Sequence, residues 1–433
     1  MVNLKRSLAL CVLVALLGGC SQQTSEEHFS NAEKLIQQGN LDAAVIELKN
    51  ALSKDGSDVQ ARQLLADLYI RQGQGLGARK ELERALELGA SPVDVMPDLA
   101  KVTFYLDDFD SLLLMDADEL PADAALAKSQ LTLYKAFSQV LLDNQVNVKE
   151  AMLKGNDLVF VQALQEFVAD RYPTVLEKLS TIDTNSLSNE VAYLSALTYA
   201  RQNAFDKAAD AYADLVKVVP ASYSIQFRYI DNLVRSKDFG GAEKVVDHFL
   251  RIQPDSPLAN YYKALITMER QEFEPTFTYI QKAINGGLVN NSTNLVAGVS
   301  AYKLGHFERS YDYLLQVRGD KNVEKLIATL QLKLGYDTEV YKTLTGIDEF
   351  APQDTALMNQ AGLSLLQGGD LEEAKQLIDM AAQLDPEDQA TQLSKGYFQL
   401  INDSEAATET FEKLLETDST LRSGWILLAA SHI

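Results

Sequence analysis

Apolar residues recur along most of the chain at intervals of three and four, the spacing that lines one face of an α-helix. Glycine stands between many consecutive apolar faces; Gly39, for example, separates the faces of residues 31–38 and 41–52. A glycine at such a position can end a helix in the left-handed conformation. The pattern therefore predicts short helices joined in pairs by tight turns.

The same pattern returns after 34 residues. Ala32 is matched by Ala66, and Gly39 is matched by Gly73. Small residues at matching positions let the two helices of a pair, and the next pair, approach closely. Helical units are expected to start near residues 25, 59, 93, 122, 156, 189, 223, 257, 291, 321, 355 and 389.

This pattern resembles the tetratricopeptide repeat, a helix-turn-helix unit of 34 residues with small residues where its helices touch. The family also places proline after the second helix, as Pro220 and Pro254 stand here. The resemblance implies an all-α fold, a right-handed α-solenoid of such units. It divides the chain into N-terminal units (28–120), degenerate helical units (121–188), regular units (189–320) and C-terminal units ending in a half-repeat (321–433).

The last segment, residues 421–433, matches only the first helix of a further unit, with Trp425 and Leu428 at its apolar positions. The end of a solenoid normally carries a polar capping helix. This half-unit is therefore either a terminal cap or the point at which the sequence is cut from something longer. Because the helix is apolar, the second interpretation is favoured, and we expect the sequence to be part of a longer repeat protein.

The first twenty residues do not follow the repeat. Lys5 and Arg6 precede an apolar run over residues 8–17, which is too short to span a membrane. The run ends in Leu-Gly-Gly-Cys20, which resembles the lipobox of bacterial lipoproteins; the alternative is an ordinary secretory signal with a chance cysteine. The resemblance implies that residues 1–19 are a signal peptide and that Cys20 carries the lipid.

Residues 20–27 are polar and are expected to form a short tether between the lipid and the helical body. Ser21, and not aspartate, follows the cysteine, which resembles sorting to the outer membrane. The body is strongly acidic, so anionic headgroups would repel it and the lipid must supply the attachment. The expected location is the periplasmic face of the outer membrane, held by a lipid anchor.

A narrower resemblance covers roughly residues 28–115, on the segments 41–52, 78–90 and 92–101. With the lipobox, these segments resemble the tetratricopeptide-repeat lipoprotein of the exosortase/PEP-CTERM system. That family belongs to Gram-negative bacteria that make exopolysaccharide and sort PEP-CTERM proteins. The resemblance implies a scaffold for protein partners in export or sorting, and not an enzyme.

Composition narrows the function classes further. The chain has 433 residues and a formal net charge of −22, which argues against nucleic acid because phosphate binding needs a basic face. Its two cysteines exclude a disulfide framework, and its four histidines fall in different units. No catalytic motif is present, so we expect no catalytic residue, no metal and no cofactor.

The acidic segment 107–119 is the one place where carboxylates gather. Asp116 and Asp118 could suggest calcium, but the segment lacks the glycine that a calcium-binding loop needs at its sixth position. A solvated acidic loop is the favoured interpretation.

Aromatic residues recur 34 apart in the regular units, at a position that faces the concave groove of such repeats. A row of rings flanked by charges could bind a peptide or a sugar chain. The alternative is that these rings belong to the core between helices, as aromatic stripes at helical spacing usually do. The candidate groove residues are Tyr193, Phe227, Tyr261, Arg201, Asp231, Arg235 and Lys303.

Overall fold

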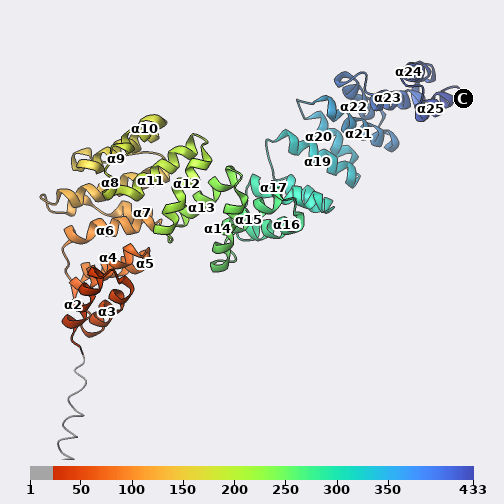
Figure 1. Cartoon of the computed structure of the whole chain (residues 1–433). Coiled ribbons are helices and arrows are strands. Elements are labelled where there is room, and N and C mark those ends of the chain that lie inside the picture. Colours follow the sequence, from red (N-terminus) through yellow and green to blue (C-terminus); the bar gives the residue numbers. More distant parts are fainter. Residues whose placement is uncertain (1–22) are drawn as a thin grey trace, which may run out of the picture. The chain divides into compact units, whose positions relative to one another are not determined.

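The structure, a computed structural model, describes residues 23–433 apart from the side chains of residues 184–186. This part of the chain contains 24 α-helices and no strand (Figure 1). The expected all-α solenoid fold is therefore confirmed. The predicted signal peptide, Cys20 and the first two residues of the tether after it lie outside the described residues.

The chain forms two compact units, which divide after Ala242 within helix α14. The first unit contains α2 (Ser25–Gln37), α3 (Leu41–Lys54), α4 (Val59–Arg71), α5 (Gly75–Glu87), α6 (Pro92–Tyr105), α7 (Phe109–Leu114), η1 (Ala117–Glu119), α8 (Ala125–Asp143), η2 (Glu150–Met152), α9 (Gly155–Val168), α10 (Tyr172–Ser180), α11 (Thr184–Arg201), α12 (Phe205–Val218) and α13 (Tyr223–Arg235).

After α14 (Phe239–Ile252), the second unit continues with paired helices of similar length. It contains α15 (Pro257–Glu269), α16 (Phe273–Asn285), α17 (Asn291–Lys303), α18 (Phe307–Leu314), α19 (Lys321–Leu334), α20 (Asp337–Thr345), η3 (Pro352–Asp354), α21 (Thr355–Gly368), α22 (Leu371–Leu384), α23 (Gln389–Asn402), α24 (Ser404–Thr417) and α25 (Arg422–Ser431).

The helices begin where the period places the units. Eight first helices start at the expected residue, and α6 and α9 start one residue before it. Helix α11 starts earlier, but its backbone breaks at Leu187 (φ −132°, ψ 31°), so its regular part begins next to residue 189. The residues with the expected start are 25, 59, 223, 257, 291, 321, 355 and 389.

The unit expected from residue 122 differs from the others. It holds one long helix, α8, which ends at Asn144 in the left-handed conformation (φ 52°). The segment that follows contains only the short η2. Val146 and Val148 pack against the core from the loop before it, and Met152 packs against the core from η2 itself. Alternating β-branched residues disfavour a helix, so no second helix forms here.

Small residues set the distance between paired helices. Ala44, Ala78 and Ala374 are completely buried, as their place in the repeat predicts. Gly362 on α21 shows how close the contact is, because a β-carbon there would lie 2.8 Å from Ile378 Cγ1 on α22. The repeat spacing therefore reflects backbone-to-backbone packing, which larger side chains would prevent.

Candidate functional site

The first ring of the expected aromatic row lies in the core. Tyr193 is 1% exposed, and its ring packs on Phe104 of α6, Phe137 of α8 and Tyr212 of α12, with centroid distances of 6.1, 5.2 and 6.0 Å. The expectation that Tyr193 faces an open groove is wrong. Helices α6 and α8 cover the face of α11 that a regular repeat would leave open.

The other two rings are partly accessible and lie in different units. Phe227 on α13 and Tyr261 on α15 are both half-buried. The Tyr261 ring packs on its neighbour Tyr262, with centroids 5.5 Å apart, at the edge of the core of the second unit. Partner binding by Phe227 and Tyr261 stays a prediction.

The charged candidates have partners within the chain. Arg201 is exposed and lies over the Phe167 ring at 5.7 Å. Arg235 Nε donates to Asp231 Oδ2 at 2.7 Å, and the Arg235 guanidinium also lies over the Phe205 ring at 5.4 Å. These contacts hold the side chains in place without burying them.

Lys303, the last of the charged candidates, ends α17 in the second unit and is exposed. Arg201 and Arg235 belong to the first unit. Their role in binding stays a prediction.

The acidic segment 107–119 is not simply a solvated loop. Asp107, at φ 60° between α6 and α7, accepts hydrogen bonds from the hydroxyls of Ser222 and Ser224 at 2.9 and 2.5 Å, and from the Ser224 backbone N–H at 2.9 Å. Asp108 caps α7 and pairs with Arg79 Nη1 at 2.6 Å. The segment thus ties α6 to the start of α13, which the repeat pattern did not show.

A buried carboxylate joins α11 to two neighbouring helices of the first unit. Glu190 on α11 is 1% exposed, and its Oε1 accepts hydrogen bonds from the hydroxyls of Tyr105 and Tyr134, each at 2.8 Å. Burial, with the nearby Glu190 charge, raises the pKa of both tyrosines well above 10. Both phenols therefore stay protonated and donate, which fixes α6 and α8 against α11.

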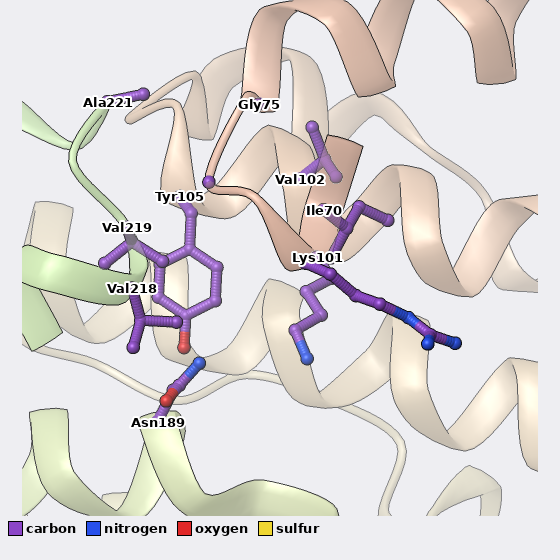
Figure 2. Close-up of a pocket in the computed structure, with 11 residues that line it drawn as sticks. Ile70, Gly75, Lys101, Val102, Tyr105, Asn189, Val218, Val219 and Ala221 are labelled. Atoms are coloured by element: carbon purple, nitrogen blue, oxygen red, sulfur yellow. The ribbon is translucent and has the colours of Figure 1, made fainter. Parts of the chain in front are cut away.

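A cavity of about 220 Å³ opens beside Tyr105 in the first unit (Figure 2). The end of α4, the α4–α5 turn, α6, α11 and the end of α12 contribute its walls. Most of the lining is apolar, with two cations and one amide. The lining residues are Ile70, Arg71, Gly73, Gly75, Lys101, Val102, Tyr105, Asn189, Val218, Val219 and Ala221.

One side of the cavity is formed where the α4–α5 turn packs closely against the α12–α13 loop. Gly73 has φ 68°, and a β-carbon on it would lie 2.7 Å from Pro220 Cδ. A larger residue would be strained by its φ and would also push the α4–α5 turn away from the α12–α13 loop. The Tyr105 ring forms another wall and is held by Glu190. The cavity is therefore a built part of the first unit.

The charges at the cavity balance one another. Arg71 pairs with Asp67 at 2.7 Å. Lys101 lies one helical turn from Asp98, and the two interact electrostatically. The cavity therefore presents hydrogen-bond donors next to apolar walls, and each of its two cations has a carboxylate nearby.

Neither a metal centre nor a membrane-spanning helix stands out in the described part of the chain. Residues 23–433 hold no group of three or more histidine, cysteine or acidic side chains placed to bind a metal ion. None of their helices has both the length and the apolar composition that crossing a bilayer requires.

Comparison with known proteins agrees with the helical pattern. Residues 35–92 and 193–257 each match a family model described as tetratricopeptide repeat. These two segments of the chain therefore carry the tetratricopeptide-repeat pattern. Repeats of this kind form scaffolds for protein–protein interaction and are generally not enzymes.

Two curated relatives share the repeat. A TPR repeat-containing protein of Methanocaldococcus jannaschii, MJ1428, is 24% identical over 274 residues, which are 56% of this chain and 47% of that protein. The human mitochondrial import receptor subunit TOM70 is 18% identical over 291 residues, which are 66% of this chain and 44% of that protein. The matched region thus spans about half the length of these relatives.

Solved structures similar to the chain include the hetero-tetramer Cut9–Hcn1 of the APC/C, at 14% identity and a TM-score of 0.33, covering 96% of this chain and 98% of that one. Yeast Tom70 is similar at 15% identity and a TM-score of 0.32, covering 94% and 95%.

Proposed function

We propose that the protein is a non-enzymatic scaffold that binds protein partners in the periplasm, anchored to the outer membrane by a lipid on Cys20. The observation that carries the proposal is the combination of tetratricopeptide repeats with an N-terminal sequence that resembles a lipobox. A receptor-like role toward other proteins also fits the name of the human relative, an import receptor subunit.

The narrower resemblance of residues 28–115 favours a role in exopolysaccharide export or in PEP-CTERM sorting by exosortase. In either process the scaffold would hold components of the envelope machinery together. The expected partners are therefore proteins of that machinery, with a polysaccharide as a further possible ligand.

The anchor is tested by Cys20→Ser in the full chain, with Cys11→Ser as the matched control. We expect an acyl label on the wild type and on Cys11→Ser, and neither the label nor outer-membrane fractionation for Cys20→Ser. A Cys20→Ser protein that still fractionates with outer membranes, together with an unlabelled wild type, would contradict the anchor.

Partner binding is tested by crosslinking in intact cells followed by purification of the wild type from membranes. Repeated recovery of the same envelope proteins, at stoichiometric amounts, is the expected result. Recovery of polymer without protein would favour the second candidate, direct glycan binding through a partly accessible ring, either Phe227 in the first unit or Tyr261 in the second. The half-buried state of these two rings is the observation that keeps this candidate open.

A further inference from the structure

The cavity beside Tyr105 contains two polar side chains whose hydrogen-bonding groups are not used by other described residues. Lys101 and Asn189 both line it, and neither forms a hydrogen bond or an ion pair within the described part of the chain. In Figure 2 the Asn189 amide lies by the Tyr105 hydroxyl, and the Lys101 ammonium points toward the same part of the cavity. Apolar walls with a few convergent polar groups are the usual composition of a binding site for a small group.

The volume limits what can enter. A cavity of roughly 150 Å³ holds benzene, with its six non-hydrogen atoms. By the same ratio, the 220 Å³ here hold about nine non-hydrogen atoms. One large side chain of a protein fits, whereas the acyl chain of a membrane lipid, with about twice as many carbons, does not.

The charges indicate a neutral group. Arg71 and Lys101 are balanced by Asp67 and Asp98, so a free carboxylate or phosphate gains little from the site. A peptide backbone suits it better, because its carbonyl accepts from an ammonium and an amide side chain can both donate to it and accept from it. Val218, 45% exposed, extends the apolar wall to the mouth.

We propose that this cavity binds one large apolar side chain of an extended segment of a partner protein. Lys101 donates to the backbone carbonyl beside that side chain, and the Asn189 amide pairs with the backbone. The proposal rests on the proposed function, that the protein binds protein partners. It places one anchor of that binding in the first unit, at residues that are not part of the aromatic row expected from the sequence.

The cavity can bind a partner side chain well because its walls are formed before the partner binds. Tyr105 is held by Glu190, and the two turns meet at Gly73 and Pro220. A pre-formed pocket loses little conformational freedom on binding, so most of the apolar contact contributes to affinity. Buried anchors of this kind carry much of the binding energy of protein interfaces.

The test uses the full chain and fluorescein-labelled, end-capped hexapeptides of glycine and serine with one variable residue. Binding is measured by fluorescence anisotropy with alanine, leucine or phenylalanine at that position. Because each buried methylene changes Kd by about fourfold, we expect leucine and phenylalanine to bind at least ~10-fold more tightly than alanine. Equal binding of all three peptides would overturn the proposal, as would displacement of the leucine peptide by hexadecanoate.

Substitutions locate the binding. Ala221→Phe fills the cavity from the α12–α13 loop and is expected to weaken the leucine peptide at least ~10-fold. Lys101→Gln and Asn189→Ala should weaken it severalfold each. The matched controls are Ala351→Phe, at a half-buried position of the second unit, and Lys80→Gln, at an exposed position of α5. Unchanged binding in the cavity variants would refute the site; if Ala221→Phe does not fold, the two polar variants decide.

Crosslinking in cells separates this proposal from the proposed function. If the wild type and a folded Ala221→Phe recover the same partners in equal amounts, the proposed scaffold function stands and the proposed side-chain pocket is overturned. If the leucine peptide binds in the cavity but the wild type recovers no partner, the side-chain pocket stands and the proposed scaffold function fails.

Discussion

An ion-pair network around Glu243 is expected to stabilise the contact of α14 with α15 at neutral pH and to lose this effect in acid. Glu243 accepts hydrogen bonds from Lys263 Nζ at 2.8 Å and from Arg270 Nη1 and Nη2 at 3.0 and 2.6 Å. The bonds from Arg270, and then that from Lys263, lower the pKa of the Glu243 carboxyl to about 2. The substitution Glu243→Gln removes the charge and keeps the shape.

The sign of the pH dependence follows from the direction of the shift. A carboxyl whose pKa is lower in the folded chain stabilises the fold fully above its unfolded pKa, and this contribution disappears as the pH falls through the folded pKa. For Glu243 the window runs from its ordinary value of 4.5 down to about 2. Above that window the contribution is complete.

The size of the effect is limited by solvent. A change from 4.5 to about 2 corresponds to at most ~3.5 kcal/mol, at about 1.4 kcal/mol for each pKa unit. The side chains of Glu243 and Arg270 are 26% and 38% exposed, so water screens part of their interaction. We therefore expect Glu243→Gln to cost about 1–2 kcal/mol at pH 7.

Hydrogen exchange by mass spectrometry over residues 257–285 measures this cost locally, because a repeat mainly affects its neighbours. Amides of α15 and α16 should exchange about 5- to 30-fold faster in Glu243→Gln than in the wild type at pH 7, with a much smaller ratio at about pH 2.5. Glu274→Gln, at an exposed position of α16, is the control and should leave exchange unchanged. A ratio for Glu243→Gln that is the same at both pH values would refute the electrostatic reasoning.

Three further changes test the packing. Ala374→Leu should destabilise its repeat by about 1–3 kcal/mol, because Ala374 is completely buried; hydrogen exchange should show the damage near α21 and α22 and not in α2–α5. Tyr105→Phe leaves Glu190 with one phenol donor and should cost about 1–3 kcal/mol in urea unfolding, and no loss would mean that this hydrogen bond contributes nothing net. Tyr261→Ala should cost about 1–2 kcal/mol, as expected for a half-buried ring, and a loss above ~3 kcal/mol with unchanged partner binding would assign the ring to the core alone.

Helix positions were largely predictable from the sequence, because they depend on local spacing. Small residues such as Ala44 and Ala78 mark the contact between paired helices, and both are completely buried. The absence of a second helix after α8 was not predictable from the period. The period predicts a helix here, but Asn144 ends α8 in the left-handed conformation and the β-branched residues that follow disfavour a new helix.

The candidate site was predicted less well, because exposure depends on contacts between distant segments. Tyr193 and Tyr261 occupy the same place in the repeat, yet Tyr193 is 1% exposed and Tyr261 is half-buried. The difference comes from α6 and α8, which cover α11. No local signal in the sequence around residue 193 carries that information.

The sequence by itself determined the all-α fold, the length of the repeat and the small residues where paired helices meet, since each follows from periodicity within about 34 residues. Only the tertiary structure decided which polar and aromatic groups face a partner. Asp107 reaches Ser224, and Tyr105 reaches Glu190, across more than eighty residues of chain. Such contacts bury some side chains and leave Lys101 and Asn189 open in a cavity, because burial is set by what packs from elsewhere in the chain.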